Sequence, residues 1–110
     1  MRNTKRNRLQ QAGWRVGSAQ DFLGLTDEEL ALIEIRLALG RSLKERRLAS
    51  GLTQQELATQ VGSSQSRIAK MESADPAVSI DLLVRSLLKL GARRQELGRI
   101  IARRIVAPAA

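Results

Sequence analysis

The fold is decided by the stretch TQQELATQVGSSQSRIAKME, residues 53–72. Thr53 and Glu56 form a capping box, in which the hydroxyl accepts from the amide three residues on and the carboxylate reaches back, so a helix begins here. Gly62 supplies the left-handed residue that ends this helix. Ser64 then caps a second helix that runs to the end of the stretch. The sequence therefore predicts two short helices joined by a tight turn.

The side chains of this helix pair divide into an inward and an outward set. The small residue Ala58 stands where two crossing helices approach closely, and the residues that can hold the pair on a core are Leu57, Val61, Ile68 and Met71. The outward face of the second helix carries only polar side chains: Gln65, Ser66, Arg67 and Lys70. A helix pair inside an ordinary bundle does not need such residues, whereas a helix that reads base edges does. The pattern indicates a DNA-reading helix-turn-helix.

On the N-terminal side, the pattern predicts a long helix. Thr26 and Glu29 form another capping box, and three acids in the first turn suit the helix dipole. This helix is expected to run toward Ser50 and to end at Gly51 as a left-handed cap. Gly40 interrupts it and predicts a bend or a break between two helices. Residues 14–25 are expected to be irregular or briefly helical.

On the C-terminal side, two more helices are expected. Ser79 caps a helix that ends at Gly91, after a loop over residues 73–78. A last helix is expected over residues 93–106, with Leu97, Ile100, Ile101 and Ile105 on one side. The expected fold is all-α with about five helices. Its parts are a flexible basic arm (1–13), an extension with the start of the long helix (14–37), the helix-turn-helix domain (38–92), and a C-terminal helix with a tail (93–110).

Composition narrows the function. The 110 residues carry a net charge of +8 and a pI of about 11.4, which favours a polyanionic partner. The chain has no cysteine and no histidine, which excludes disulfides, thiolate metal sites and histidine-based catalytic triads. No paired carboxylates lie in an apolar setting that would tune them for catalysis. We therefore expect a protein that is not an enzyme and holds no metal or cofactor.

The chain offers no candidate membrane segment. Its longest apolar run, Leu30–Leu39, is interrupted by Glu34 and Arg36 and is too short to span a bilayer. The basic N-terminus is not followed by the apolar stretch of a secretory signal. The sequence therefore predicts a protein without membrane partners that works in the cytoplasm, on the nucleoid.

The segments Gly51–Ala58, Val61–Ser66 and Met71–Glu72 resemble the Cro/phage-repressor (XRE) family, and the resemblance covers about residues 38–92. It implies a lambda-repressor-like domain that binds duplex DNA and regulates transcription, most often by repression. Mapped by position, it implies base contacts from Gln65, Ser66 and Arg67, a phosphate contact from Gln54, and an ion pair between Arg47 and Glu72. Lys70 is expected to hold a phosphate as well.

One departure from the family pattern is visible. Family members often have Asn-Gly after the paired Glu, whereas this chain has Ser73-Ala74 followed by Asp75-Pro76. We therefore expect a loop of different shape here. No phosphate contact is assigned to this loop from the resemblance.

The flanking residues narrow the resemblance. Gly13-Trp14, Asp21–Leu25 and Val78–Leu83 resemble HigA-type antitoxins and their unpaired relatives. That resemblance implies a homodimer, an operator with two half-sites, and a RelE-like (HigB-like) ribonuclease toxin as a further partner. A protein-binding antitoxin whose main role is to neutralise that toxin is therefore one alternative. An RNA-binding module is another, although the near absence of aromatic residues argues against it.

A surplus of apolar surface also favours a homodimer. The Leu30–Leu39 segment is apolar on two faces, and the predicted C-terminal helix adds a third apolar stripe. We expect the C-terminal stripe to form the dimer interface, through Leu97, Ile100, Ile101 and Ile105. The Leu30–Leu39 segment is the alternative interface.

Overall fold

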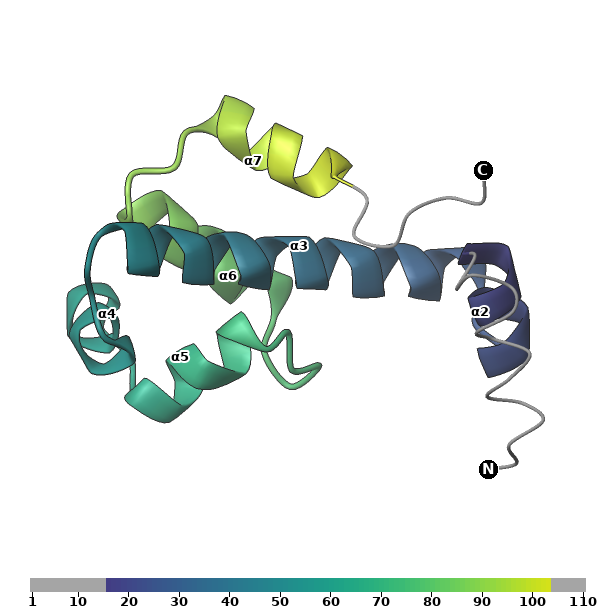
Figure 1. Cartoon of the computed structure of the whole chain (residues 1–110), viewed down its shortest axis with the longest axis horizontal. Coiled ribbons are helices and arrows are strands. Elements are labelled where there is room, and N and C mark those ends of the chain that lie inside the picture. The colour runs from purple at the N-terminus through teal and green to yellow at the C-terminus, as the bar shows by residue number, and fades with distance from the viewer. Residues whose placement is uncertain (1–15, 104–110) are drawn as a thin grey trace. The chain divides into compact units, whose positions relative to one another are not determined.

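The computed structural model describes residues 16–103, which are all-helical, with no strand among them (Figure 1). The expected all-α class is confirmed. The arm (1–13), Trp14 and Ile105 lie outside the described residues. Among residues 16–103, none of the helices combines the length and the apolar character that a membrane span requires. The helices are α2 (Val16–Leu23), α3 (Asp27–Ala49), α4 (Gln54–Val61), α5 (Gln65–Glu72), α6 (Ile80–Lys89) and α7 (Arg94–Ala102).

The chain divides into two compact units. Among the described residues, the first comprises residues 16–34 and the second residues 35–103. The second unit therefore holds most of α3 and the whole of α4 to α7.

The first unit contains the turn between α2 and α3. Gly24 has a φ of 70°, and the amide of Leu25 donates to the carbonyl of Gln20 at 3.0 Å. The capping box at the start of α3 is confirmed, because Thr26 Oγ1 accepts from the Glu29 amide at 3.1 Å and Glu29 Oε1 accepts from the Thr26 amide at 2.8 Å. These hydrogen bonds fix the angle at which the chain leaves α2 and enters α3.

The bend or break expected at Gly40 is wrong, because α3 continues as one helix through this position. Gly40 is buried where α3 meets the C-terminal end of α5. A Cβ atom at this position would lie 2.5 Å from the backbone oxygen of Met71. The glycine therefore serves the close approach of two helices rather than a change in direction.

The core of the second unit is aliphatic and is built around α3. In the view of Figure 1, α4 and α5 lie on one side of α3 and α7 on the other. Each helix of this unit contributes at least one buried apolar side chain, and those with no exposed surface are Ala38, Leu39, Leu43, Leu57, Ala58, Ile68, Met71, Leu83 and Leu87. This core holds the α4–α5 pair on the end of α3.

Helix α7 does not present the apolar residues predicted for it on one open face. Ile100 is 5% exposed and belongs to the core, whereas Leu97 is half-buried and Ile101 is 42% exposed. An apolar residue in the core of one chain is not available to a second chain. Of the described residues in the predicted dimer interface, Ile101 has the most open side chain.

Candidate nucleic-acid interface

Local hydrogen bonds set the bounds of α4 and α5 as predicted. Thr53 Oγ1 accepts from the Glu56 amide at 3.0 Å, and Glu56 Oε1 accepts from the Thr53 amide at 2.8 Å. Gly62 ends α4 with a φ of 71°, and Ser64 Oγ accepts from the Arg67 amide at 3.2 Å to begin α5. The four-residue boxes and the left-handed glycine thus act within a few residues, which is why the sequence alone reveals them.

The residues expected to pack this helix pair occupy its inner side. Leu57 and Ala58 of α4 have no exposed surface, and neither do Ile68 and Met71 of α5. Val61 is half-buried. The pair is therefore anchored by dry contacts, and its outer side is available to a partner.

The outer side of α5 carries the four polar residues singled out in the sequence, and all four are exposed: Gln65, Ser66, Arg67 and Lys70. Beside them lies a notch of about 240 Å³, which α5 shares with the loop that follows it. The notch is lined by Ser64, Ser66, Arg67, Lys70, Ala77 and Val78. Hydroxyls and cations thus line one surface, which is chemistry suited to phosphates and base edges.

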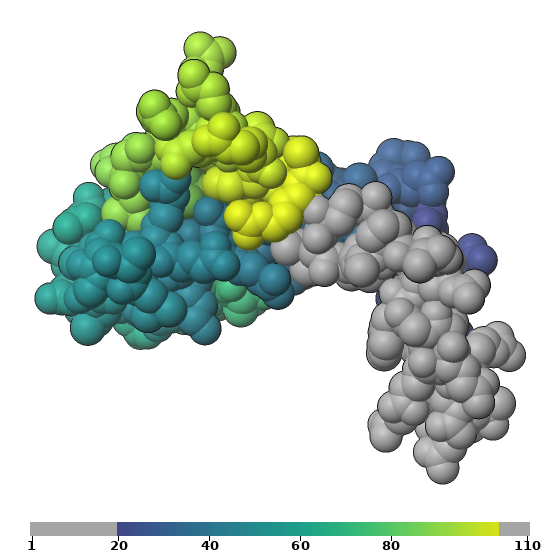
Figure 2. All heavy atoms as spheres, turned by 45° about the horizontal axis from the view of Figure 1, so that its top comes forward, coloured from purple at the N-terminus to yellow at the C-terminus, as the bar shows by residue number. Residues whose placement is uncertain are grey.

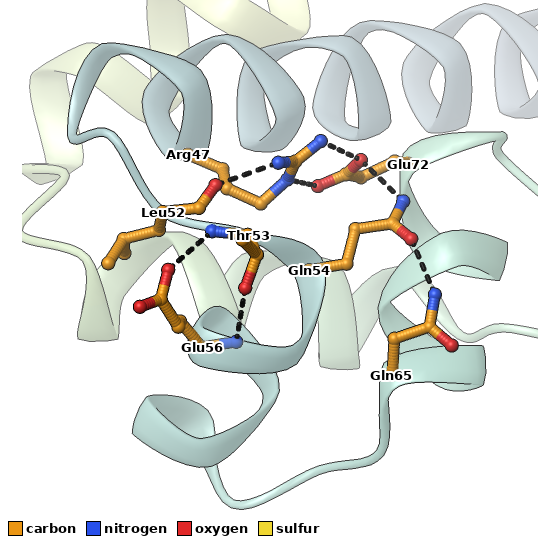
Figure 3. A network of polar contacts seen from close by, with 7 residues as sticks. All are labelled: Arg47, Leu52, Thr53, Gln54, Glu56, Gln65 and Glu72. Atoms are coloured by element: carbon orange, nitrogen blue, oxygen red, sulfur yellow. Dashed lines mark hydrogen bonds and ion pairs between the residues drawn. The ribbon is translucent and has the colours of Figure 1, made fainter.

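Beneath this surface, α3 and α5 are joined by an ion pair (Figure 3). Arg47 Nε donates to Glu72 Oε2 at 2.6 Å, and Arg47 Nη2 donates to Glu72 Oε1 at 3.1 Å. The Arg47 side chain is 10% exposed and the Glu72 side chain 4%. A third bond, from Arg47 Nη1 to the Leu52 carbonyl at 2.8 Å, ties the α3–α4 turn to the pair. The hydrogen bond to Glu72 raises the pKa of Arg47, and the two-bond geometry fixes the positions of both groups.

The ion pair continues outward through two glutamine amides. Gln54 Nε2 donates to Glu72 Oε1 at 3.1 Å, and Gln65 Nε2 donates to Gln54 Oε1 at 2.7 Å. Figure 3 shows the resulting polar chain from buried Arg47 to exposed Gln65. Gln54 is half-buried and joins α4 to the first residue of α5.

The structure therefore brings four of the predicted residues into one network, namely Arg47, Glu72, Gln54 and Gln65. The family resemblance implies a phosphate contact for Gln54 and gives no sign of its bonds to Glu72 and Gln65. No local pattern contains this signal, because Gln54 and Gln65 are 11 residues apart and meet only once the helices cross. An amide nitrogen carries two hydrogens, so one N–H of Gln54 lies outside these two bonds.

The loop after α5 contains the departure from the family pattern. Ala74 has a φ of 59°, in the left-handed region that glycine adopts without strain. The backbone here therefore has a conformation that suits glycine, at the position where family members often have one. Asp75 Oδ1 accepts from the Ala77 amide at 2.8 Å, and Arg36 Nε donates to the Val78 carbonyl at 3.3 Å. The Ala77 amide is thus already bonded within the loop.

The described residues do not bring three or more carboxylates together in a group that could hold a metal ion. What the α5 surface offers is amide, hydroxyl and cationic groups on a fixed helix pair. This set can form hydrogen bonds and ion pairs with a polyanion.

A comparison with models of known protein families identifies the family of this chain. The helix-turn-helix family model HTH_3, of the XRE type, matches residues 43–97, half of the 110-residue chain. The match includes Arg47, Gln54, Glu72 and the whole of α5. No curated protein and no solved structure gives a significant match. The chain belongs to the XRE-type helix-turn-helix family and is a DNA-binding transcriptional regulator.

Proposed function

We propose that this regulator represses transcription by placing α5 in the major groove of a specific operator. The observation that carries the proposal is the polar chain that ends at Gln65. Its amide stands on the exposed first residue of α5 and is held by Gln54, which is held in turn by buried Glu72. A side chain fixed in this way is suited to reading one base edge, because a base contact needs a defined donor and acceptor.

The free hydrogen-bonding groups of Gln65 favour adenine. One N–H bonds to Gln54, which leaves the other N–H as a donor and Oε1 as an acceptor. Adenine presents the matching acceptor N7 and donor N6 in the major groove. Arg67 offers the two donors that suit guanine, and the hydroxyl of Ser66 suits any base edge. Phosphate contacts from Lys70 and from the second N–H of Gln54 would set the register.

A homodimer is part of the proposal. A single domain of this type covers one half-site, and two-fold symmetry doubles the contact length. Exposed Ile101 and half-buried Leu97 support an interface through α7, and exposed Leu32 and Ile33 support the alternative through α3. Sedimentation at micromolar concentration separates these alternatives. A mass near 12.1 kDa contradicts the dimer, and a dimer that persists in Ile101→Asp contradicts the α7 interface.

The DNA-binding proposal is tested by selecting operators from a random duplex library and then measuring variants on the best one. Arg67→Ala should weaken binding by about 1–3 kcal/mol and relax the preference at one base position. Lys70→Ala should weaken binding to all DNA sequences alike. It should also reduce the slope of log affinity against log salt concentration by about 1. Gln60→Ala, which changes an exposed residue of α4, is the control. If a folded Gln65→Ala/Arg67→Ala double variant keeps operator affinity, the base-reading face is not on α5.

An antitoxin role is a second candidate function. It is supported by the resemblance of the flanking segments to HigA-type proteins, and it predicts a RelE-like ribonuclease encoded beside this chain. Tight binding of that protein, with loss of its nuclease activity, would establish the role. The RNA-binding alternative is tested by comparing affinity for duplex DNA with that for single-stranded RNA of the same sequence, and preference for the RNA would overturn the DNA proposal.

A further inference from the structure

The first unit contains a segment whose charge is opposite to that of the rest of the chain. Residues 16–34 hold five acids and no Lys or Arg, which gives −5 in a chain of +8, so the remaining residues carry +13. The acids are Asp21, Asp27, Glu28, Glu29 and Glu34. Phosphates would be repelled here, so DNA binding does not explain this segment.

The same segment exposes large apolar side chains. Leu23 at the end of α2 is 62% exposed, and Leu32 and Ile33 of α3 are 47% and 41% exposed. On a helix surface, residues four apart are neighbours, so Glu28 stands beside Leu32 and Glu29 beside Ile33. Exposed apolar side chains beside carboxylates are typical of surfaces that bind other proteins.

The backbone that carries these residues is well ordered by hydrogen bonds. Gln20 Nε2 donates to Asp27 Oδ1 at 2.5 Å across the α2–α3 turn, in addition to the capping box of Thr26 and Glu29. Glu29 and Asp27 therefore have structural tasks, whereas Asp21 and Glu28 are exposed carboxylates outside these bonds. A surface held in one conformation loses little entropy when a partner binds.

We propose that the exposed apolar side chains of this segment, Leu23, Leu32 and Ile33, together with the exposed carboxylates of Asp21 and Glu28, dock a protein whose own surface is cationic and apolar. Charge complementarity selects this occupant. A second copy would place acids against acids in a two-fold interface, which costs free energy. The proposal goes beyond operator binding and does not depend on it.

The test measures binding of a helical Leu/Lys amphipathic peptide to the full-length protein at two salt concentrations. Leu32→Ser/Ile33→Ser and Asp21→Lys/Glu28→Lys should each weaken binding by about tenfold or more, since one removes apolar side chains and the other the complementary charge. Asp81→Lys reverses one exposed carboxylate of α6, half the charge change of the acidic double variant, and is the charge control, with an expected change under about twofold. The peptide assay contains no DNA, which keeps a failure here distinct from a failure of operator binding.

Three outcomes would overturn the proposal. If Asp81→Lys weakened peptide binding equally, binding would depend only on the overall charge of the protein. A lower sedimentation mass of Leu32→Ser/Ile33→Ser without peptide would make a second copy the occupant. A rise in peptide affinity of about tenfold when Arg2, Lys5, Arg6 and Arg8 are changed to Gln would make the chain's own basic segment the occupant.

Discussion

Helix α3 supports the α4–α5 pair and α7 by different means. The pair contributes four apolar residues with no exposed surface and a buried ion pair. Helix α7 contributes one buried side chain, Ile100, and the ion pair Arg46–Glu96 at 2.7 Å, whose side chains are 27% and 28% exposed. Figure 2 shows α7 lying over α3, and a groove of about 350 Å³ lies between the two helices. The proposed DNA-reading pair is thus fixed by dry packing, and α7 is held largely by polar contacts open to water.

The largest expected effect is on the buried ion pair. Glu72→Ala leaves the Arg47 guanidinium buried without its carboxylate, and we expect a loss of about 3–5 kcal/mol in the free energy of unfolding. Urea unfolding measures this loss. The double variant Arg47→Met/Glu72→Leu removes both charges and should recover much of the stability. An unchanged midpoint for Glu72→Ala would show that the pair does not hold α3 to α5.

Substituting one glycine in α3, at its contact with α5, and one glycine in α7 compares the tightness of packing at these two places. At Gly40 a Cβ would meet the Met71 backbone oxygen at 2.5 Å, so Gly40→Ala should destabilise the protein by about 1–3 kcal/mol despite the helix preference of alanine. At Gly98 of α7 a Cβ meets nothing within 4 Å, so Gly98→Ala should stabilise by up to about 1 kcal/mol. Thermal unfolding of both variants measures the two changes in stability. Changes of the same sign would contradict the expected difference in packing.

Much of this fold was predictable because its signals are local. The capping boxes at Thr26 and Thr53, the caps at Ser64 and Ser79, and the end of α4 at Gly62 each depend on a few neighbouring residues. The role of Gly40 was not predictable in this way, because it depends on the carbonyl of Met71, far along the chain.

The same reasoning applies to the candidate site. Residue types and helical spacing placed Gln65, Ser66, Arg67 and Lys70 on one exposed face. The hydrogen bonds that join Gln54 to Glu72 and to Gln65 arise from the crossing of α4 and α5, which spacing along one helix does not describe.

A smaller effect on stability is expected in the loop that follows α5. Ala74 holds a left-handed φ of 59°, which costs an L-residue with a Cβ about 1 kcal/mol. Ala74→Gly should therefore stabilise the protein by roughly 0.5–1 kcal/mol, reduced by the greater freedom of glycine in the unfolded chain. Gly62→Ala, at a φ of 71°, is the matched reverse substitution and should destabilise. A loss of stability in Ala74→Gly would show that the loop carries no such strain.

The smallest effect on stability is expected from the carboxylate of Glu96 in α7. Bonds from the Arg93 amide and then from Arg46 lower the pKa of Glu96 below its ordinary value of 4.5. A lowered pKa stabilises the folded state above pH 4.5, and this contribution is lost as the pH falls through the lowered value. Unfolding followed between pH 7 and pH 3 should therefore show a shallower acid loss in Glu96→Gln than in the unmodified protein. Parallel curves would contradict the role of Glu96.

The polar chain that ends at Gln65 has a consequence for how operator preference can evolve. In the proposed function, Gln65 reads its base with a side chain already ordered, whereas exposed Arg67 must give up about 0.5–1.5 kcal/mol of rotamer freedom on binding. A substitution at Gln65 leaves Gln54 without one partner, so a new preference at that base requires a compensating change in α4. Ser66 and Arg67 stand outside the network and can change singly. New operators in a lineage of this protein would then arise first at the bases that face Ser66 and Arg67.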